Sequence, residues 1–417
     1  MGIPLITRHR EVAPGQYEVA PFFGFVTTQI DQNLMLMQIM EEVAKSYGLA
    51  CLLQEKPFEG INGSGKHNNW SIGTDDGTNL FNVKQLAERS NSTEIFPVVM
   101  AAVIAAVDEY GDLMRMSICP PGNDFRLGAC EAPPSIMSMY LGESMTRYLE
   151  GYRDGVDTPY NPRPHPHSLG VDALPDVIIP AEDRNRTSPF PYGGHRFEFR
   201  AVGSSQNVSL VNTVLGTICA KSFKNFADQI EAGASPKTVA QNALKEHWRI
   251  IFNGNGYDVN NQRELIERGL WSINNGVDGI KRYTVEKNME LFGEMKVLSR
   301  EECFARSEVM YNHYSNVVEI EVKCMIDMIV QNIVPGLRAA GVGPLKELEA
   351  AADKLRHDFD EIHHTSDPEA KAQLSRTLRL ETMIDVRKLC TEAERVCPSN
   401  LWTVATYKEL LFVDQCT

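Results

Sequence analysis

The segment GINGSGKHNNWS, residues 60–71, decides how the rest of the chain is interpreted. Its first seven residues match the G-x-x-x-x-G-K part of a phosphate-binding loop, but His67 stands where that loop needs a Ser or Thr to hold magnesium. The residues after His67 are rich in turn formers and have no helical periodicity, so no helix amino terminus would point at a phosphate. We therefore predict that this is not a nucleotide-binding loop of that kind.

Charge and composition exclude several classes of partner. Lys and Arg total 41 against 55 Asp and Glu, the net charge is -14, and the basic residues are scattered, so nucleic acid is not an expected partner. The longest apolar run, residues 95–107, contains Pro97 and is too short to cross a bilayer, which predicts a buried helix and no membrane association. The nine cysteines include no C-x-x-C pair, and no secretory signal opens the chain. We expect a cytoplasmic protein, with an organelle as the open alternative.

Periodicity predicts an α+β fold. Residues 3–7 and 18–22 are expected strands on either side of a Pro14-Gly15 turn, followed by a helix over residues 29–47 and a short apolar run over residues 49–53. Residues 150–195 are rich in Pro, Gly, Asn and His and are expected to form an ordered excursion over a site. From about Val285 amphipathic helical patterns dominate, so we predict a catalytic domain over residues 1–284 and a helical region over residues 285–417.

Four residues are candidate metal ligands. Glu11 and Glu18 flank the Pro-Gly turn, so a hairpin would bring their carboxylates together, and His67 is a further candidate. In HRFEFR, strand alternation places Glu198 on one face between two arginines, and burying that face is costly unless a metal and an anion pair with it. The alternatives are solvated hairpin charges, a structural histidine and an exposed edge strand.

Five motifs resemble the catalytic domain of glutamine synthetase, in the same order and with similar spacing: EVAPGQYE, NGSGKHNNWS, RLGACEAPP, RNRTSPF and HRFEFR. Their wording is similar to the type III class, and the resemblance covers almost the whole chain. It implies an α+β fold with an antiparallel curved sheet and flanking helices, followed by a helical carboxy-terminal region. It also implies ATP-dependent ligation of ammonia to L-glutamate through γ-glutamyl phosphate, with Mg²⁺ or Mn²⁺, in a ring-shaped homo-oligomer, a dodecamer.

The resemblance also implies roles for individual residues. Glu11 and Glu18 match ligands of one metal, and His67 and Glu198 match ligands of the second, which bridges the nucleotide phosphates. Residues that match substrate and nucleotide contacts are Asn62, Gly63, Arg126 and Arg200 for glutamate, Ser71 for the nucleotide, and Arg186 and Arg196 for the transferring phosphate. Glu131 matches the flap glutamate, which closes the site and helps to deprotonate ammonium.

Three departures from the family pattern bear on these roles. Arg126 lies five residues before Glu131, whereas some classes have six, and Phe190-Pro191 stands in the region of a further arginine. The chain also starts just before Glu11, with no counterpart of the amino-terminal β-grasp domain, so it resembles the carboxy-terminal portion of a longer protein and is expected to be inactive alone. The alternative functions are a catalytically dead interaction or regulatory subunit and a related γ-glutamyl-amine ligase.

Overall fold

A computed structural model describes residues 2–160, 165–167, 177–179 and 185–411. The chain divides into two compact units. The larger unit is Phe23–Arg300, and the second unit combines Met1–Phe22 with Glu301–Thr417. The predicted domain boundary at 284/285 stays a prediction, and the compact units instead divide at Arg300.

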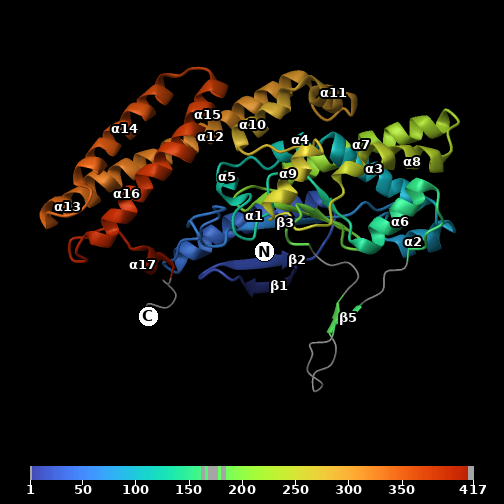
Figure 1. Cartoon of the computed structure of the whole chain (residues 1–417), viewed down its shortest axis with the longest axis horizontal. Helices are drawn as coiled ribbons and strands as arrows, with labels where there is room; N and C mark the ends of the chain where they lie inside the picture. Colours follow the sequence, from blue (N-terminus) through green and yellow to red (C-terminus); the bar gives the residue numbers. More distant parts are fainter. Residues whose placement is uncertain (1, 161–164, 168–176, 180–184, 412–417) are drawn as a thin grey trace. The chain divides into compact units, whose positions relative to one another are not determined.

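The larger unit mixes helices with short strands, as an α+β fold requires (Figure 1). Its longer helices are α1 (Val26–Ser46), α2 (Val83–Ser90), α3 (Ile95–Glu109), α6 (Glu143–Asp154), α7 (Ser209–Glu231), α8 (Pro236–His247), α9 (Val259–Glu267) and α11 (Glu286–Glu294). Its shorter helical turns are α4 (Gly111–Met116), α5 (Asn123–Arg126), η1 (Trp248–Ile250), α10 (Gly276–Ile280) and η2 (Lys281–Thr284). The expected helix over residues 29–47 is thereby confirmed as α1.

The apolar run over residues 95–107 forms α3 and is the centre of the core of this unit. Twelve of the 15 residues of α3 are buried, as expected of a helix that is apolar on all sides. Pro97 lies in the first turn, where its missing N–H breaks no helical hydrogen bond. α7 and α8 pack along α3 (Figure 1), and Ser222 of α7 donates a hydrogen bond of 2.6 Å to the carbonyl of Ala102. The prediction of a buried helix is confirmed.

The strands of the described residues pair in twos rather than in one broad sheet. The larger unit holds the antiparallel pairs β3 (Gly65–Trp70) with β8 (Phe197–Gly203) and β5 (His165–His167) with β6 (Val177–Ile179), and the parallel pair β4 (Met139–Tyr140) with β7 (Phe190–Pro191). Residues 49–53 form no strand. Part of the expected excursion over residues 150–195, namely 161–164, 168–176 and 180–184, lies outside the described residues.

The second unit joins a β-hairpin to a group of helices. The hairpin pairs β1 (Leu5–Arg10) with β2 (Tyr17–Pro21), which confirms the two strands predicted around the Pro14-Gly15 turn. The helical segments are α12 (Arg300–Met328), the π-helical turn η3 (Ile329–Ile333), α13 (Val334–Ala340), α14 (Leu345–His364), α15 (Pro368–Thr377), the π-helical turn η4 (Leu378–Thr382), α16 (Met383–Val396) and α17 (Tyr407–Leu411). The helical character predicted beyond Val285 is confirmed.

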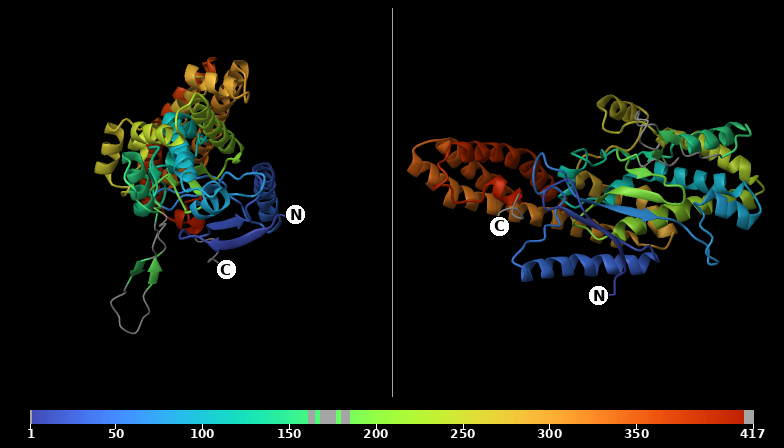
Figure 2. Two further views of the ribbon diagram at one scale, coloured as in Figure 1. Left: turned by 90° about the vertical axis from the view of Figure 1, so that its right-hand side faces the viewer. Right: turned by 90° about the horizontal axis from the view of Figure 1, so that it is seen from below.

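Amphipathic stripes hold these helices together. α14 buries Leu348, Ala352, Leu355 and Ile362, which recur at the spacing of one helical face. α14 and α16 lie side by side, as Figure 2 shows in orange and red. The buried guanidinium of Arg379 in η4 donates hydrogen bonds of 2.6 and 3.0 Å to the carboxylate of Glu321 in α12. Within the described residues, none of the helices has the length and apolar character needed to span a membrane.

Candidate functional site

The β3–β8 pair carries much of the predicted site. Lys66 pairs with Val202 and Asn68 with Phe199, so the single residue His67 on β3 faces two residues, Arg200 and Ala201, on β8. This two-against-one arrangement is a β-bulge, which twists the strands and changes where a side chain points. The bulge therefore sets the position of His67 beside the charged face of β8.

Glu198 and Arg200 form a buried ion pair on that face. Glu198 Oε1 accepts hydrogen bonds from Arg200 Nε at 3.0 Å and from Arg200 Nη2 at 2.5 Å. Glu198 and Arg200 are 6% and 5% exposed, and every residue of β8 is buried, so the alternative of an exposed edge strand is wrong. His67 Nδ1 lies 3.8 Å from the same Glu198 oxygen. The chain thus holds a buried carboxylate and a buried guanidinium beside an imidazole that is exposed to solvent.

Arg196 extends the same face at its more open end. It is half-buried, and its Nε donates a hydrogen bond of 2.7 Å to Asn69 Oδ1, where Asn69 is the register partner of Glu198. Its Nη1 lies 2.9 Å from Nε2 of His195. Ser71, just after β3, is exposed. The predicted alternation of Arg196, Glu198 and Arg200 on one face is consistent with these contacts.

Arg126, which the sequence predicts to bind glutamate, is almost completely buried and makes contacts within the unit. It is 3% exposed, and it donates hydrogen bonds to the carbonyls of Val202 at 3.2 Å and Arg200 at 2.9 Å. Burial lowers the pKa of its guanidinium to about 10. A Cβ at Gly65 would lie 2.0 Å from Arg126 Nη2, so a glycine is needed where β3 crosses this side chain. Arg126 therefore ties α5 to β8, and its contact with a substrate stays a prediction.

The loop before β3 holds the two residues matched to glutamate binding. Asn62 and Gly63 are half-buried, and the amide of the next residue, Ser64, donates a hydrogen bond of 2.8 Å to the carbonyl of Glu55. Lys66 Nζ donates to the carbonyl of Ser204. The loop is thus fixed to the rest of the unit at both of its sides.

Glu131 and Arg186 lie on loops at the surface of the larger unit. Glu131 is exposed and has a φ of +56°, in the left-handed region that a residue with a side chain seldom adopts. Arg186 is exposed, and its carbonyl accepts a hydrogen bond of 3.5 Å from the hydroxyl of Tyr257. Strain of this kind is common at functional sites, which is consistent with a working loop around Glu131.

Tyr257 is a residue that the sequence reasoning missed. Burial raises the pKa of its phenol, and the charges of four predicted site residues also act on that pKa: Arg200, Glu131, Arg126 and Arg186. The phenol therefore lies among these groups. The one signal in the sequence is the turn-rich segment NGNGYD around it, which by itself indicates only a loop.

The hairpin of the second unit brings together three further candidate ligands. His9 Nε2 lies 2.8 Å from Glu11 Oε1 and 3.0 Å from Glu18 Oε2. One ligand atom from each residue lies within 4.8 Å of the others. The sequence predicted that the hairpin would join the two carboxylates but missed His9, which is the register partner of Glu18 across the hairpin. Two carboxylates and one imidazole at this spacing fit a divalent cation such as Mg²⁺ or Mn²⁺.

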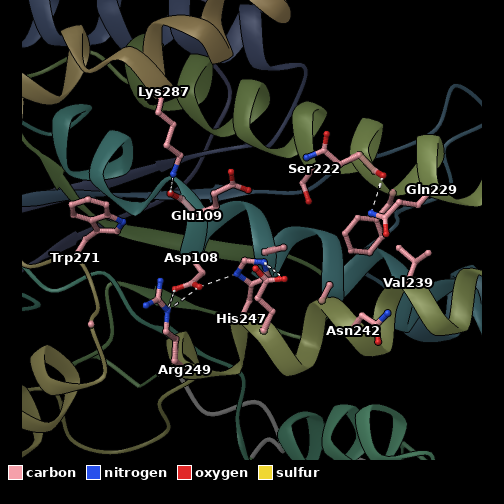
Figure 3. A pocket seen from close by; sticks show the side chains of 16 residues that line it. Asp108, Glu109, Ser222, Gln229, Val239, Asn242, His247, Arg249, Trp271 and Lys287 are labelled. Carbon is pink, nitrogen blue, oxygen red and sulfur yellow. Dashed lines mark hydrogen bonds and ion pairs between the residues drawn. The ribbon is translucent and has the colours of Figure 1, made fainter.

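A cavity of about 680 Å³ lies in the larger unit (Figure 3). It opens between α3, α7 and α8, and none of the predicted site residues lines it. Asp108 in its wall is buried and accepts hydrogen bonds from His247 Nδ1 at 2.9 Å and Arg249 Nε at 3.0 Å (Figure 3). These bonds join the end of α3 to the end of α8, so Asp108 serves the packing of the unit.

Comparison with known proteins identifies the family. The glutamine synthetase catalytic domain matches residues 1–114, and the glutamine synthetase C-terminal domain matches residues 236–343. A type-3 glutamine synthetase of Dictyostelium discoideum is 35% identical over 99% of this chain. The chain belongs to the glutamine synthetase family. A glutamine synthetase of Butyrivibrio fibrisolvens is 34% identical over 99% of the chain, and one of Bacteroides fragilis is 35% identical over 80% of it.

Coverage of these glutamine synthetases is partial. The chain spans 61% of the Dictyostelium protein, 63% of the Butyrivibrio protein and 47% of the Bacteroides protein. Among solved structures, ligand-free GmaS matches 76% of this chain and 57% of its own chain, with a TM-score of 0.45 and 15% identity. The predicted family and fold class are confirmed, and the roles of single residues in this chain stay predictions.

Proposed function

We propose that the protein ligates ammonia to L-glutamate at the expense of ATP and forms L-glutamine through γ-glutamyl phosphate. The observation that carries this proposal is the buried Glu198–Arg200 pair with His67 beside it at the β3–β8 bulge. Membership of the glutamine synthetase family supports it, and the relatives named above do not favour a dead homologue or an amine ligase. The Glu198–Arg200 pair is buried, and a divalent cation and a substrate carboxylate beside it would help to offset the cost of removing both charges from water.

The reaction has two steps, and the residues divide between them. A side-chain carboxylate oxygen of glutamate attacks the γ-phosphorus of ATP, ADP leaves, and Arg186 and Arg196 stabilise the charge on the transferring phosphoryl oxygens. Ammonia then attacks the carbonyl carbon of the acyl phosphate, and inorganic phosphate leaves. Glu131 accepts a proton from ammonium and closes the site against water.

The remaining residues bind and orient. Arg200 and Arg126 bind the carboxylates of glutamate, Asn62 and Gly63 contact it from the loop, and Ser71 contacts the nucleotide. His67 and Glu198 would hold one divalent cation, and His9, Glu11 and Glu18 would hold the other. Bound Mg²⁺ or Mn²⁺ would neutralise negative charge on the phosphates. Both cations prefer ligand sets that are rich in oxygen atoms.

The proposal is tested by γ-glutamyl hydroxamate formation. The protein produced from its own genomic locus is incubated with glutamate, ATP, hydroxylamine and Mg²⁺ or Mn²⁺. Hydroxamate that depends on all four additions supports the function. A well-folded protein that releases no hydroxamate and no ADP above a no-glutamate control would refute it.

His9→Ala is expected to weaken Mn²⁺ binding by the 417-residue chain about tenfold, because it removes one of three ligands from the hairpin cluster. The measurement is Mn²⁺ titration followed by calorimetry or by electron paramagnetic resonance of the free ion. His313→Ala, on α12 of the same unit, is the control and should leave the affinity unchanged. Equal loss in both variants would argue against a hairpin metal site.

The helical region is proposed as the assembly surface of a ring-shaped homo-oligomer, in a cytoplasmic protein. The support is that α12 exposes several large apolar side chains, among them Phe304, Val309 and Ile320, which a partner subunit would cover. Residues 286–294 form α11, which packs on α7 in the larger unit, so the test removes residues 301–417 and not residues 285–417. We expect light scattering to show fewer subunits in each particle, and an unchanged number of subunits would contradict the proposal.

A further inference from the structure

Glu55 is a buried carboxylate that is neither a predicted metal ligand nor a predicted substrate contact. It is 1% exposed and lies in the segment QEKPFEG, directly before the loop that contains Asn62 and Gly63. A carboxylate that is so completely removed from water persists only where hydrogen bonds and opposite charge compensate it.

Glu55 contacts the substrate loop through its main chain and the end of β8 through its side chain. Its carbonyl accepts the hydrogen bond of 2.8 Å from the amide of Ser64, inside the loop. Its Oε1 accepts hydrogen bonds from Ser205, at 3.0 Å from the amide and at 2.5 Å from the hydroxyl. One residue thus links two segments that are about 140 positions apart in the sequence, residues 60–66 and the turn that follows β8.

Two glycines make room for this carboxylate. A Cβ at Gly122 would lie 2.0 Å from Glu55 Oε2, and a Cβ at Gly203 would lie 2.4 Å from Glu55 Oε1. Gly122 precedes α5, the short helix that ends at Arg126, and Gly203 ends β8. The carboxylate therefore lies between the backbone that presents Arg126 and the backbone that presents Glu198 and Arg200.

The negative charge of Glu55 acts on the cationic side chains near it. Arg126 and Arg200 are both buried, and Lys66 is half-buried beside them. Burial lowers the pKa of Arg126 and that of Lys66, and in both cases the negative charge of Glu55 acts in the opposite direction. Arg200 already has Glu198 as its partner, whereas Arg126 hydrogen-bonds to neutral groups in the described contacts: the side chain of Asn123 and the carbonyls of β8.

We propose that Glu55 is a positioning residue that holds the Asn62–Gly63 loop and Arg126 against the end of β8 and thereby sets the affinity for glutamate. This inference rests on the proposed function, because glutamate is the substrate assigned to that loop. Glu55 itself touches no reacting atom. It acts through the Ser64 and Ser205 amides and through the charge it presents to Arg126.

The test compares Glu55→Gln with Asp108→Asn. Both substitutions are isosteric and remove a buried negative charge that accepts hydrogen bonds within the larger unit, but Asp108 lies in the wall of the cavity at α3 and far along the chain from the substrate loop. In steady-state kinetics, Glu55→Gln is expected to raise KM for glutamate about tenfold while KM for ATP changes less than about twofold. Asp108→Asn should lower the melting temperature but leave both KM values unchanged.

Hydrogen exchange gives a second measurement that does not depend on activity. In Glu55→Gln the amide of Ser205, which donates to the side chain that loses its charge, should exchange at least about tenfold faster than in the parent, and in Asp108→Asn it should not. A loss of kcat with both KM values unchanged, or unchanged protection of the Ser205 amide, would overturn the positioning role. If the parent forms no glutamine, the proposed function fails, and the exchange rate of Ser205 still decides whether the Glu55 carboxylate holds the end of β8.

Discussion

Glu198→Gln is expected to reduce glutamine formation by at least about a thousandfold, because it removes a charged ligand from the place where the phosphoryl group is transferred. The physical reason is that an amide oxygen keeps the shape of the carboxylate but not its charge. The measurement is kcat/KM for glutamate at saturating Mg²⁺ and ATP, together with the affinity for metal-ATP by calorimetry. Unchanged affinity for metal-ATP would show that Glu198 is not a metal ligand.

The matched control is Glu264→Gln, which changes an exposed glutamate that pairs with Arg268 in the same unit. Activity and metal-ATP affinity should remain at the parental level in this variant.

Glu198→Ala is a harsher change than Glu198→Gln. It leaves the buried guanidinium of Arg200 without the carboxylate that accepts two of its hydrogen bonds, so we expect it to cost about 3 kcal/mol of unfolding free energy. Urea unfolding of both variants separates the loss of stability from the loss of charge, and the glutamine variant is therefore the better test of catalysis.

Glu131→Ala is expected to lower kcat by about a hundredfold or more while KM for glutamate and for ATP changes little, because the carboxylate acts on ammonium after both substrates have bound. The assay is amide formation at saturating ammonia and neutral pH, where a flap without its carboxylate also admits water. ADP release without a matching amount of glutamine would report that leak. Parental glutamine production by the Glu131→Ala variant would contradict the proposal that Glu131 closes the site and deprotonates ammonium.

The backbone of Glu131 offers an internal control. Its φ of +56° is costly for alanine, whereas glycine adopts it without strain. The free energy of unfolding of Glu131→Gly should therefore be about 1 kcal/mol larger than that of Glu131→Ala. If the carboxylate matters for chemistry, both variants lose kcat to the same extent in spite of that difference in stability. A loss of kcat in Glu131→Ala alone would mean that the strained loop conformation, and not the carboxylate, is what the reaction needs.

Local patterns in the sequence were enough to predict individual helices and strands. The Pro14-Gly15 turn with strands on either side predicted the hairpin of β1 and β2, and the all-apolar run that starts at residue 95 predicted the buried helix α3. Alternation in HRFEFR placed Arg196, Glu198 and Arg200 on one face, and the order of five motifs identified the family. Each of these signals lies within a few neighbouring residues, where backbone geometry alone relates one side chain to the next.

Tertiary structure decided what each charged group faces. The bulge that sets His67 beside Glu198 needs β3 and β8 to pair across about 130 residues, and no local period encodes that register. Burial of Arg126, the position of Tyr257 among the arginines, the third ligand His9 and the link made by Glu55 follow from the same long-range contacts. The sequence by itself determined which residues are available and on which face of their own element they lie. Packing determined their partners, because burial and ion pairing depend on segments that meet only in the folded chain.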